Sequence, residues 1–145
     1  AESTMRALGA KNIRVLRGVE DQKAFDKGLN NTTTARDLSI ILAAIQENKA
    51  ASAKSCATMR EVLLEQEFNT GIPAELPPGT KVAHKTGWIT GITHDAALVY
   101  PEKGPPYVLV VLTKGIPDEP VAQKLIADIS KMVYEHAMGV SLAAH

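Results

Sequence analysis

The spacing of the apolar residues changes at Gly79, and this change limits the possible folds more than any other feature of the sequence. Before it, apolar residues recur at helical spacing, as they do at Leu38, Ile41, Leu42 and Ile45. After it, three ranges have a period of two and are predicted strands: residues 81–86, 96–100 and 107–113. The helical period returns from Asp118 to Met138. Helices, then an antiparallel meander, then a covering helix predict an α+β fold.

The part of the chain before the strands divides at its capping residues. Residues 1–10 are predicted to be the end of a helix, with Gly9 as its C-terminal cap. Residues 12–31 have mixed charge and no sustained period, and are predicted to be a long ordered loop. Hydroxyl groups at residues 32–34 are typical of a helix start. Two helices are therefore predicted to follow the loop, over residues 32–49 and 52–67.

Composition excludes several classes of partner. A chain of 145 residues is long enough for one domain with a sizeable core. Its 16 Lys and Arg residues are balanced by 16 Asp and Glu residues and form no cluster, so there is no electrostatic footprint for nucleic acid or anionic lipid. The apolar runs are far shorter than the about 20 residues of a membrane span. The single cysteine, Cys56, forms no internal disulfide and is predicted to be buried.

The motif that carries chemistry is Lys85-Thr86-Gly87, followed by Trp88, at the end of the first predicted strand. Neighbouring side chains on a strand point to opposite faces, so one ligand meets both Lys85 and Thr86 only at a strand edge. Gly87 lets a substrate approach that edge closely, and the amide of Trp88 is a candidate donor to an oxyanion. The alternative interpretation is an edge strand with a solubilising lysine.

A metal site is a weaker hypothesis. His84 and His94 lie ten residues apart, and Asp95 is adjacent to the second histidine. The sequence offers no convincing third ligand, so local hydrogen bonding of the histidines and a structural role for Asp95 are favoured. We therefore expect no metal and no cofactor.

Several segments together resemble one family, the class A β-lactamases and their serine-hydrolase relatives. The segments that carry the resemblance are residues 5–9, Arg17, residues 31–38, residues 76–87 and residues 93–101. The resemblance implies a β-lactamase or penicillin-binding-protein-like fold. In it, residues 1–145 are the C-terminal portion of one domain, with a helical part (1–79) that includes an Ω-like loop (12–31). A three-stranded meander plus the C-terminal helix (80–145) completes it.

The resemblance also implies an activity and roles for the motif. These enzymes open β-lactams through an acyl-enzyme, and use Ser-x-x-Lys, Ser-Asp-Asn and Lys-Thr-Gly elements. In that scheme Lys85 directs positive charge at the substrate carboxylate and a proton-relay hydroxyl. Thr86 donates a hydrogen bond to the carboxylate, and the Trp88 amide is half of the oxyanion hole. The resemblance thus makes Lys85, Thr86, Gly87 and Trp88 the substrate-binding residues, and implies extracytoplasmic localisation and antibiotic resistance.

The other two elements are absent: no serine in the chain is followed three residues later by lysine, and no Ser-x-Asn or Tyr-x-Asn occurs. We expect the nucleophile in an N-terminal segment of the same enzyme, and expect the strand at Tyr107 to Thr113 to pair with that segment or with a second copy. The deacylating glutamate is also displaced, since Val19 occupies its position and Glu20 follows. Glu20 is therefore either a catalytic base shifted by one residue or a solvated carboxylate. The second possibility implies a penicillin-binding D-Ala-D-Ala peptidase or esterase. Another alternative for the chain as a whole is a non-catalytic half-domain that needs a partner segment.

Overall fold

The structure is a computed structural model that describes residues 1–140 and Leu142. The helices and strands occur in the following order: α1 (Glu2–Ala7), α2 (Gln22–Asp26), α3 (Ala35–Gln46), α4 (Ala53–Leu64), β1 (Lys81–Ile89), β2 (Ile92–Tyr100), β3 (Tyr107–Lys114) and α5 (Glu119–Met138). Of the expected range 80–145, Ser141 and residues 143–145 lie outside the described residues. None of the helices in the described part is both long and apolar enough to span a bilayer.

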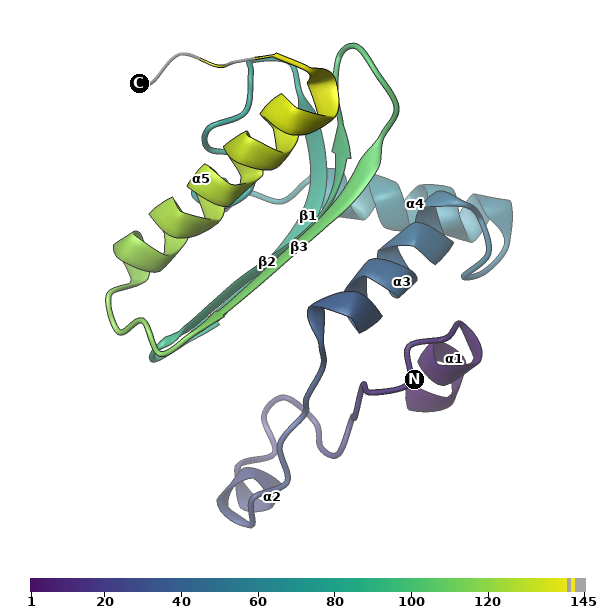
Figure 1. The fold of residues 1–145 in the computed structure, drawn as a ribbon. Helices are drawn as coiled ribbons and strands as arrows, with labels where there is room; N and C mark the ends of the chain where they lie inside the picture. The colour runs from purple at the N-terminus through teal and green to yellow at the C-terminus, as the bar shows by residue number, and fades with distance from the viewer. Residues whose placement is uncertain (141, 143–145) are drawn as a thin grey trace.

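The three strands form one antiparallel sheet in the order β1-β2-β3. Helix α5 packs on one face of this sheet, and α3 and α4 pack against its strands on the other side (Figure 1). The prediction of an α+β fold with a three-stranded meander and a covering helix is therefore confirmed.

Each face of the sheet has its own core. The buried residues of the core between the sheet and α5 are Ile72, Ala97, Val99, Val111 and, on α5 itself, Ile126. On the other face the buried residues are Leu42, Ala83 and Leu98. Because strand side chains alternate between faces, this division also assigns the faces along β1: Ala83 and Lys85 belong to the α3 side, and His84 and Thr86 to the α5 side.

Side-chain caps set where the long helices begin. Thr34, Ser52 and Asp118 precede α3, α4 and α5, and each accepts a hydrogen bond from a backbone N–H in the first turn. At the other end of α5, Gly139 adopts a left-handed conformation with φ of 63°, which ends the helix. The three helices consequently occupy most of the ranges that the sequence predicts.

Two segments differ from the sequence-based expectation. The loop at 12–31 contains the short helix α2, which is capped by Asp21 and is too brief to show a period. Strands β1 and β2 continue through residues predicted as a link, because the hairpin turn is only Thr90 and Gly91. Gly91, the second residue of this turn, has a φ of 72°, which glycine adopts without strain. Gly87 and Trp88 therefore lie in β1 itself.

Tyr107 at the start of β3 gives a pH-dependent prediction. Burial, and secondarily the neighbouring Tyr134, raises the pKa of Tyr107 to about 12 from 10.0. Between these values the unfolded chain loses this proton and the folded chain keeps it, so the free energy of unfolding decreases as the pH rises. We expect Tyr107→Phe to weaken this decrease, measured by urea denaturation at several pH values from about 9 to about 12. An identical decrease in both proteins would contradict the assignment.

Candidate active site

Strand β1 is an edge strand that carries the Lys-Thr-Gly motif. The Lys85 side chain is exposed, and its Nζ donates a hydrogen bond to the Thr86 carbonyl oxygen at 2.6 Å. Thr86 is partly buried on the opposite, α5-facing side, and its buried hydroxyl has no hydrogen-bond partner among residues 1–140 and 142. Gly87 has no atom within 4 Å of the position that a Cβ would occupy. The structure therefore leaves the outer edge of β1 open beside Lys85, where a ligand could lie against the backbone.

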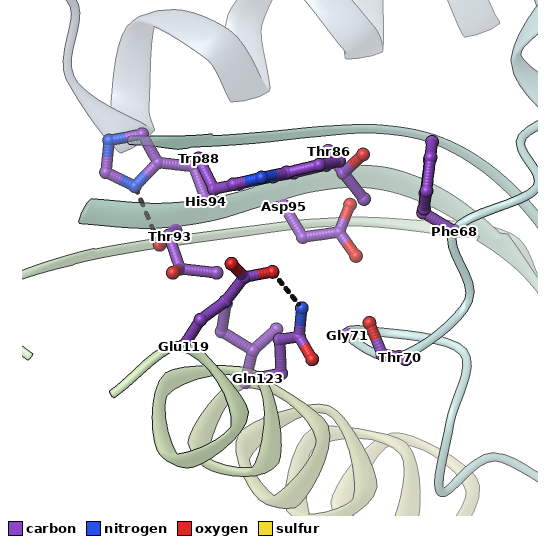
Figure 2. A pocket seen from close by; sticks show the side chains of 11 residues that line it. Phe68, Thr70, Gly71, Thr86, Trp88, Thr93, His94, Asp95, Glu119 and Gln123 are labelled. Carbon is purple, nitrogen blue, oxygen red and sulfur yellow. Dashed lines mark hydrogen bonds between the residues drawn. The ribbon is translucent and has the colours of Figure 1, made fainter. Parts of the chain in front are cut away.

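A cavity of about 110 Å³ lies on the α5 side of this strand. Figure 2 shows Thr86 and Asp95 on its sheet side, across from Glu119 and Gln123 of α5, whose side chains are hydrogen-bonded at 2.7 Å. Trp88 closes another part of the wall. Neither Lys85 nor Glu20 lines this cavity. Of the four residues predicted to be catalytic, the structure thus brings Thr86 and Trp88 together here and places Lys85 on the other face.

Trp88 packs against the connector that precedes β1. Its indole and the Phe68 ring form an edge-to-face pair, with ring centroids 5.1 Å apart and an interplanar angle of 70°. Both rings remain substantially exposed, at 44% for Trp88 and 56% for Phe68. An edge-to-face pair of this kind contributes about 0.5–1.5 kcal/mol beyond its buried area. The Phe68 ring therefore holds the Trp88 ring in place next to the end of β1, which is at Ile89.

Below the motif lies a buried polar pair, His84 and Asp95, each only 1% exposed. His84 Nδ1 is 2.9 Å from Asp95 Oδ1 and 3.2 Å from Oδ2. The expected local hydrogen bonding of His84 and structural role of Asp95 agree with this geometry. His94 takes no part in the pair, because its Nδ1 lies 2.9 Å from the Thr93 carbonyl oxygen. No cluster suited to a metal ion occurs among residues 1–140 and 142.

The proximity of His84 and Asp95 follows from the hairpin register, although the predicted strands at 81–86 and 96–100 leave Asp95 outside them. With the turn at Thr90 and Gly91, Thr86 pairs with Asp95 and His84 pairs with Ala97. His84 and Asp95 are then diagonal neighbours on the same face of the hairpin. The correct turn length would have placed the two side chains together, since hairpin register follows from the turn.

Glu20 lies in an exposed turn of the loop that precedes α2. Arg17 braces this turn, because its Nη1 donates to the carbonyl oxygens of Gly18 at 2.9 Å and Val19 at 2.7 Å. The Arg17 guanidinium also lies over the Phe25 ring, 5.0 Å from its centroid. Val19 is 87% exposed, which is unusual for a valine. Arg17 thus presents Val19 and Glu20 together on the surface.

The base of this loop is closed by main-chain and side-chain bonds. Arg14 and Thr32 pair as an isolated antiparallel bridge, and the Asn31 Oδ1 accepts hydrogen bonds from the backbone N–H groups of Leu16 and Arg17. In Figure 1 the loop with α2 extends beyond the layers that the sheet and its covering helices form. The segment is therefore a loop with a closed neck that contains the short helix α2.

Comparison with known proteins agrees with the fold. An α+β fold whose edge strand bears Lys-Thr-Gly places the chain among the β-lactamase and penicillin-binding-protein folds. A model of the Beta-lactamase enzyme family matches residues 1–137, and the chain belongs to that family. A β-lactamase from Bacillus licheniformis is 39% identical over 111 residues. That match covers 71% of the chain and 34% of the relative.

Solved structures extend the comparison. PBP-A superimposes with a TM-score of 0.84 at 28% identity, over 95% of this chain and 50% of its own. A PBP-A variant solved as an acyl-enzyme complex with penicillin G has a TM-score of 0.82 at 29% identity, over 95% of this chain and 50% of its own. A β-lactamase from Sphaerobacter thermophilus superimposes with a TM-score of 0.87 at 25% identity, over 97% of this chain and 53% of its own. The chain thus spans about half the length of these structures and about a third of the curated relative.

Proposed function

We propose that this chain provides the Lys-Thr-Gly wall of a serine hydrolase that β-lactams acylate. The observation that carries the proposal is the exposed Lys85 ammonium on the open edge of β1, within a chain of this family. Lys85 attracts the substrate carboxylate and Thr86 donates a hydrogen bond to it. Gly87 permits close approach of the substrate, and the Trp88 amide stabilises the developing oxyanion. Support comes from PBP-A, a variant of which forms an acyl-enzyme with penicillin G.

The proposal assigns the serine nucleophile to a segment outside this chain, because the chain has no Ser-x-x-Lys element. Within the described residues the sheet ends at β3, whose outer backbone groups have no strand partner. An unpaired edge of this kind is a template for another strand. We infer that the N-terminal segment of the same enzyme, or a second copy of the chain, pairs there. We also infer an extracytoplasmic location, periplasmic or secreted, since penicillin-type substrates act there.

A second candidate function is that of a penicillin-binding D-Ala-D-Ala peptidase or esterase. The observation that favours it is Val19, which occupies the position where the resemblance expects a deacylating glutamate. If Glu20 does not act as the base, the acyl-enzyme forms and then persists. The two candidates therefore share the acylation step and differ in deacylation.

Mass spectrometry of the full-length protein after incubation with penicillin tests the proposal. We expect the intact mass to increase by one penicillin, because acylation adds the whole β-lactam to the serine. A persistent adduct indicates the penicillin-binding function, and a transient adduct with accumulating penicilloate indicates a β-lactamase that uses Glu20 or another base. The 145-residue chain alone is the control and should gain no mass. A full-length protein without adduct or product would instead favour a non-catalytic half-domain.

A further inference from the structure

Three polar side chains connect the residues before β1 to the strand that bears the motif. Asp95 of β2 accepts a hydrogen bond from the backbone N–H of Ile72 at 2.9 Å, and His84 of β1 contacts the same carboxylate. On the other side of the imidazole, His84 Nε2 lies 3.2 Å from Asn69 Oδ1. Asn69, His84 and Asp95, here called the tether, thus join residues 69–72 to both strands of the hairpin.

The hydrogen-bond partners define the donors in the tether. Asp95 uses its carboxylate as acceptor, so His84 Nδ1 is the donor in that contact. Asn69 Nδ2 donates to the carbonyl oxygens of Gln66 at 3.4 Å and Glu67 at 3.1 Å, which leaves Asn69 Oδ1 facing the imidazole. His84 Nε2 lies 3.2 Å from that oxygen. The imidazole is therefore held between Asp95 on one side and Asn69 on the other.

The tether lies directly beside the proposed substrate-binding residues. His84 precedes Lys85 in β1, and Asn69 follows Phe68, whose ring packs on Trp88. Gly71 lies so close to Asp95 that an added Cβ would be 2.6 Å from Oδ2. The connector therefore cannot slide along the hairpin without breaking a buried contact, and its position determines that of Phe68.

We propose that Asn69, His84 and Asp95 are positioning residues, which fix the Trp88 end of β1 by holding Phe68 against the indole. Their catalytic consequence rests on the proposed function, in which the Trp88 amide stabilises the oxyanion. None of the three touches the substrate. They act through the connector: His84 and Asp95 are buried on the α5 side of the sheet, opposite Lys85, and Asn69 contacts His84 from an exposed position on the connector.

The single tryptophan of the chain allows a test that does not depend on activity. Asn69→Leu removes the acceptor at an exposed position, so the chain is expected to remain folded. Collisional quenching of Trp88 by acrylamide should rise about twofold, because the indole is 44% exposed now and would be nearly fully exposed without Phe68. Gln46→Leu is the matched control. It removes an amide that accepts a hydrogen bond from Tyr100 Oη at 2.7 Å, far along β2, and should leave the quenching unchanged.

A second variant keeps the test decisive if Asn69→Leu has local effects of its own. In His84→Asn the amide nitrogen takes the place of Nδ1 and still donates to Asp95, but the shorter side chain releases Asn69. Acrylamide should therefore quench Trp88 in His84→Asn to the same extent as in Asn69→Leu. Unchanged quenching in both variants would overturn the proposal.

Acylation provides the functional readout. In the full-length protein, Asn69→Leu should lower the acylation rate by about tenfold, because a displacement of the order of 1 Å is costly at a reacting centre. Gln46→Leu should not. An equal loss of acylation rate in both variants would mean that the tether stabilises the fold but does not position Trp88 for acylation. If the unaltered protein is never acylated, the proposed function fails, whereas the quenching measurement still decides whether the tether holds Trp88.

Discussion

Lys85→Ala is expected to slow acylation of the full-length protein by penicillin about 10²–10³-fold, which is the loss on removing one preorganised electrostatic donor from an active site. Within the part of the chain that the structure describes, the exposed Lys85 ammonium is bonded only to the neighbouring Thr86 carbonyl oxygen at 2.6 Å, so no core contact is lost with it. The defect should therefore appear in the acylation rate, followed by mass spectrometry of quenched samples, and not in stability.

The control for this variant is Lys81→Ala. Lys81 is exposed, lies on the same strand and, four residues earlier, belongs to the same face of the sheet as Lys85. Removing either lysine changes the net charge equally, so a general loss of attraction for an anionic substrate would affect both variants alike. A specific role requires that Lys81→Ala react at nearly the original rate. An unchanged acylation rate in Lys85→Ala would exclude the assigned role.

The alternation of β1 separates two tasks. Lys81 and Lys85 are exposed on the α3 side, while His84 is buried on the α5 side with Asp95. The sequence predicts this separation, because a lysine and its neighbour on a strand must point apart. If the tether acts as proposed, the buried His84 and Asp95 position the strand, while Lys85 projects from the other face. On this reading, the exposed Lys-Thr-Gly motif depends on the buried pair of His84 and Asp95 on the other face of the strand.

The parts of the fold that follow from periodicity could be predicted from the sequence. Helices α3 and α5 and the three strands repeat their apolar residues often enough to reveal a period. Helix α2 has only five residues and its position depends on the Asp21 cap, so its pattern is too short to detect. The hairpin turn was missed because Gly91 alone distinguishes a two-residue turn from a longer link.

The site was predictable only in part, for a related reason. Lys85, Thr86, Gly87 and Trp88 are adjacent in sequence, so one motif identifies them together. Asn69, His84 and Asp95 come from three separate segments, and their proximity follows from the hairpin register and the path of the connector. Glu20 lies on a loop whose side chains have no periodic constraint. Its role as catalytic base therefore remains a prediction that deacylation kinetics test.

Gly71→Ala is expected to lower the free energy of unfolding by about 3 kcal/mol, the upper part of the range for overpacking a well-filled site. The new Cβ would lie 2.6 Å from Asp95 Oδ2 and 3.4 Å from its Cγ. Asp95 is 1% exposed and bonded to both His84 and the Ile72 N–H, so its carboxylate cannot move aside without leaving buried partners unsatisfied.

The matched control is Gly18→Ala. Neither Gly18 nor Gly71 has a positive φ, so alanine introduces no backbone strain at either position, and no atom lies within 4 Å of a Cβ at Gly18. Alanine there should be neutral or stabilise the fold by a few tenths of a kcal/mol up to about 1, because it restricts the unfolded chain. Urea denaturation of both variants therefore separates a clash at Asp95 from the general effect of replacing glycine. Equal stability of the two variants would mean that Asp95 yields freely, and that the buried pair does not fix the connector against the hairpin.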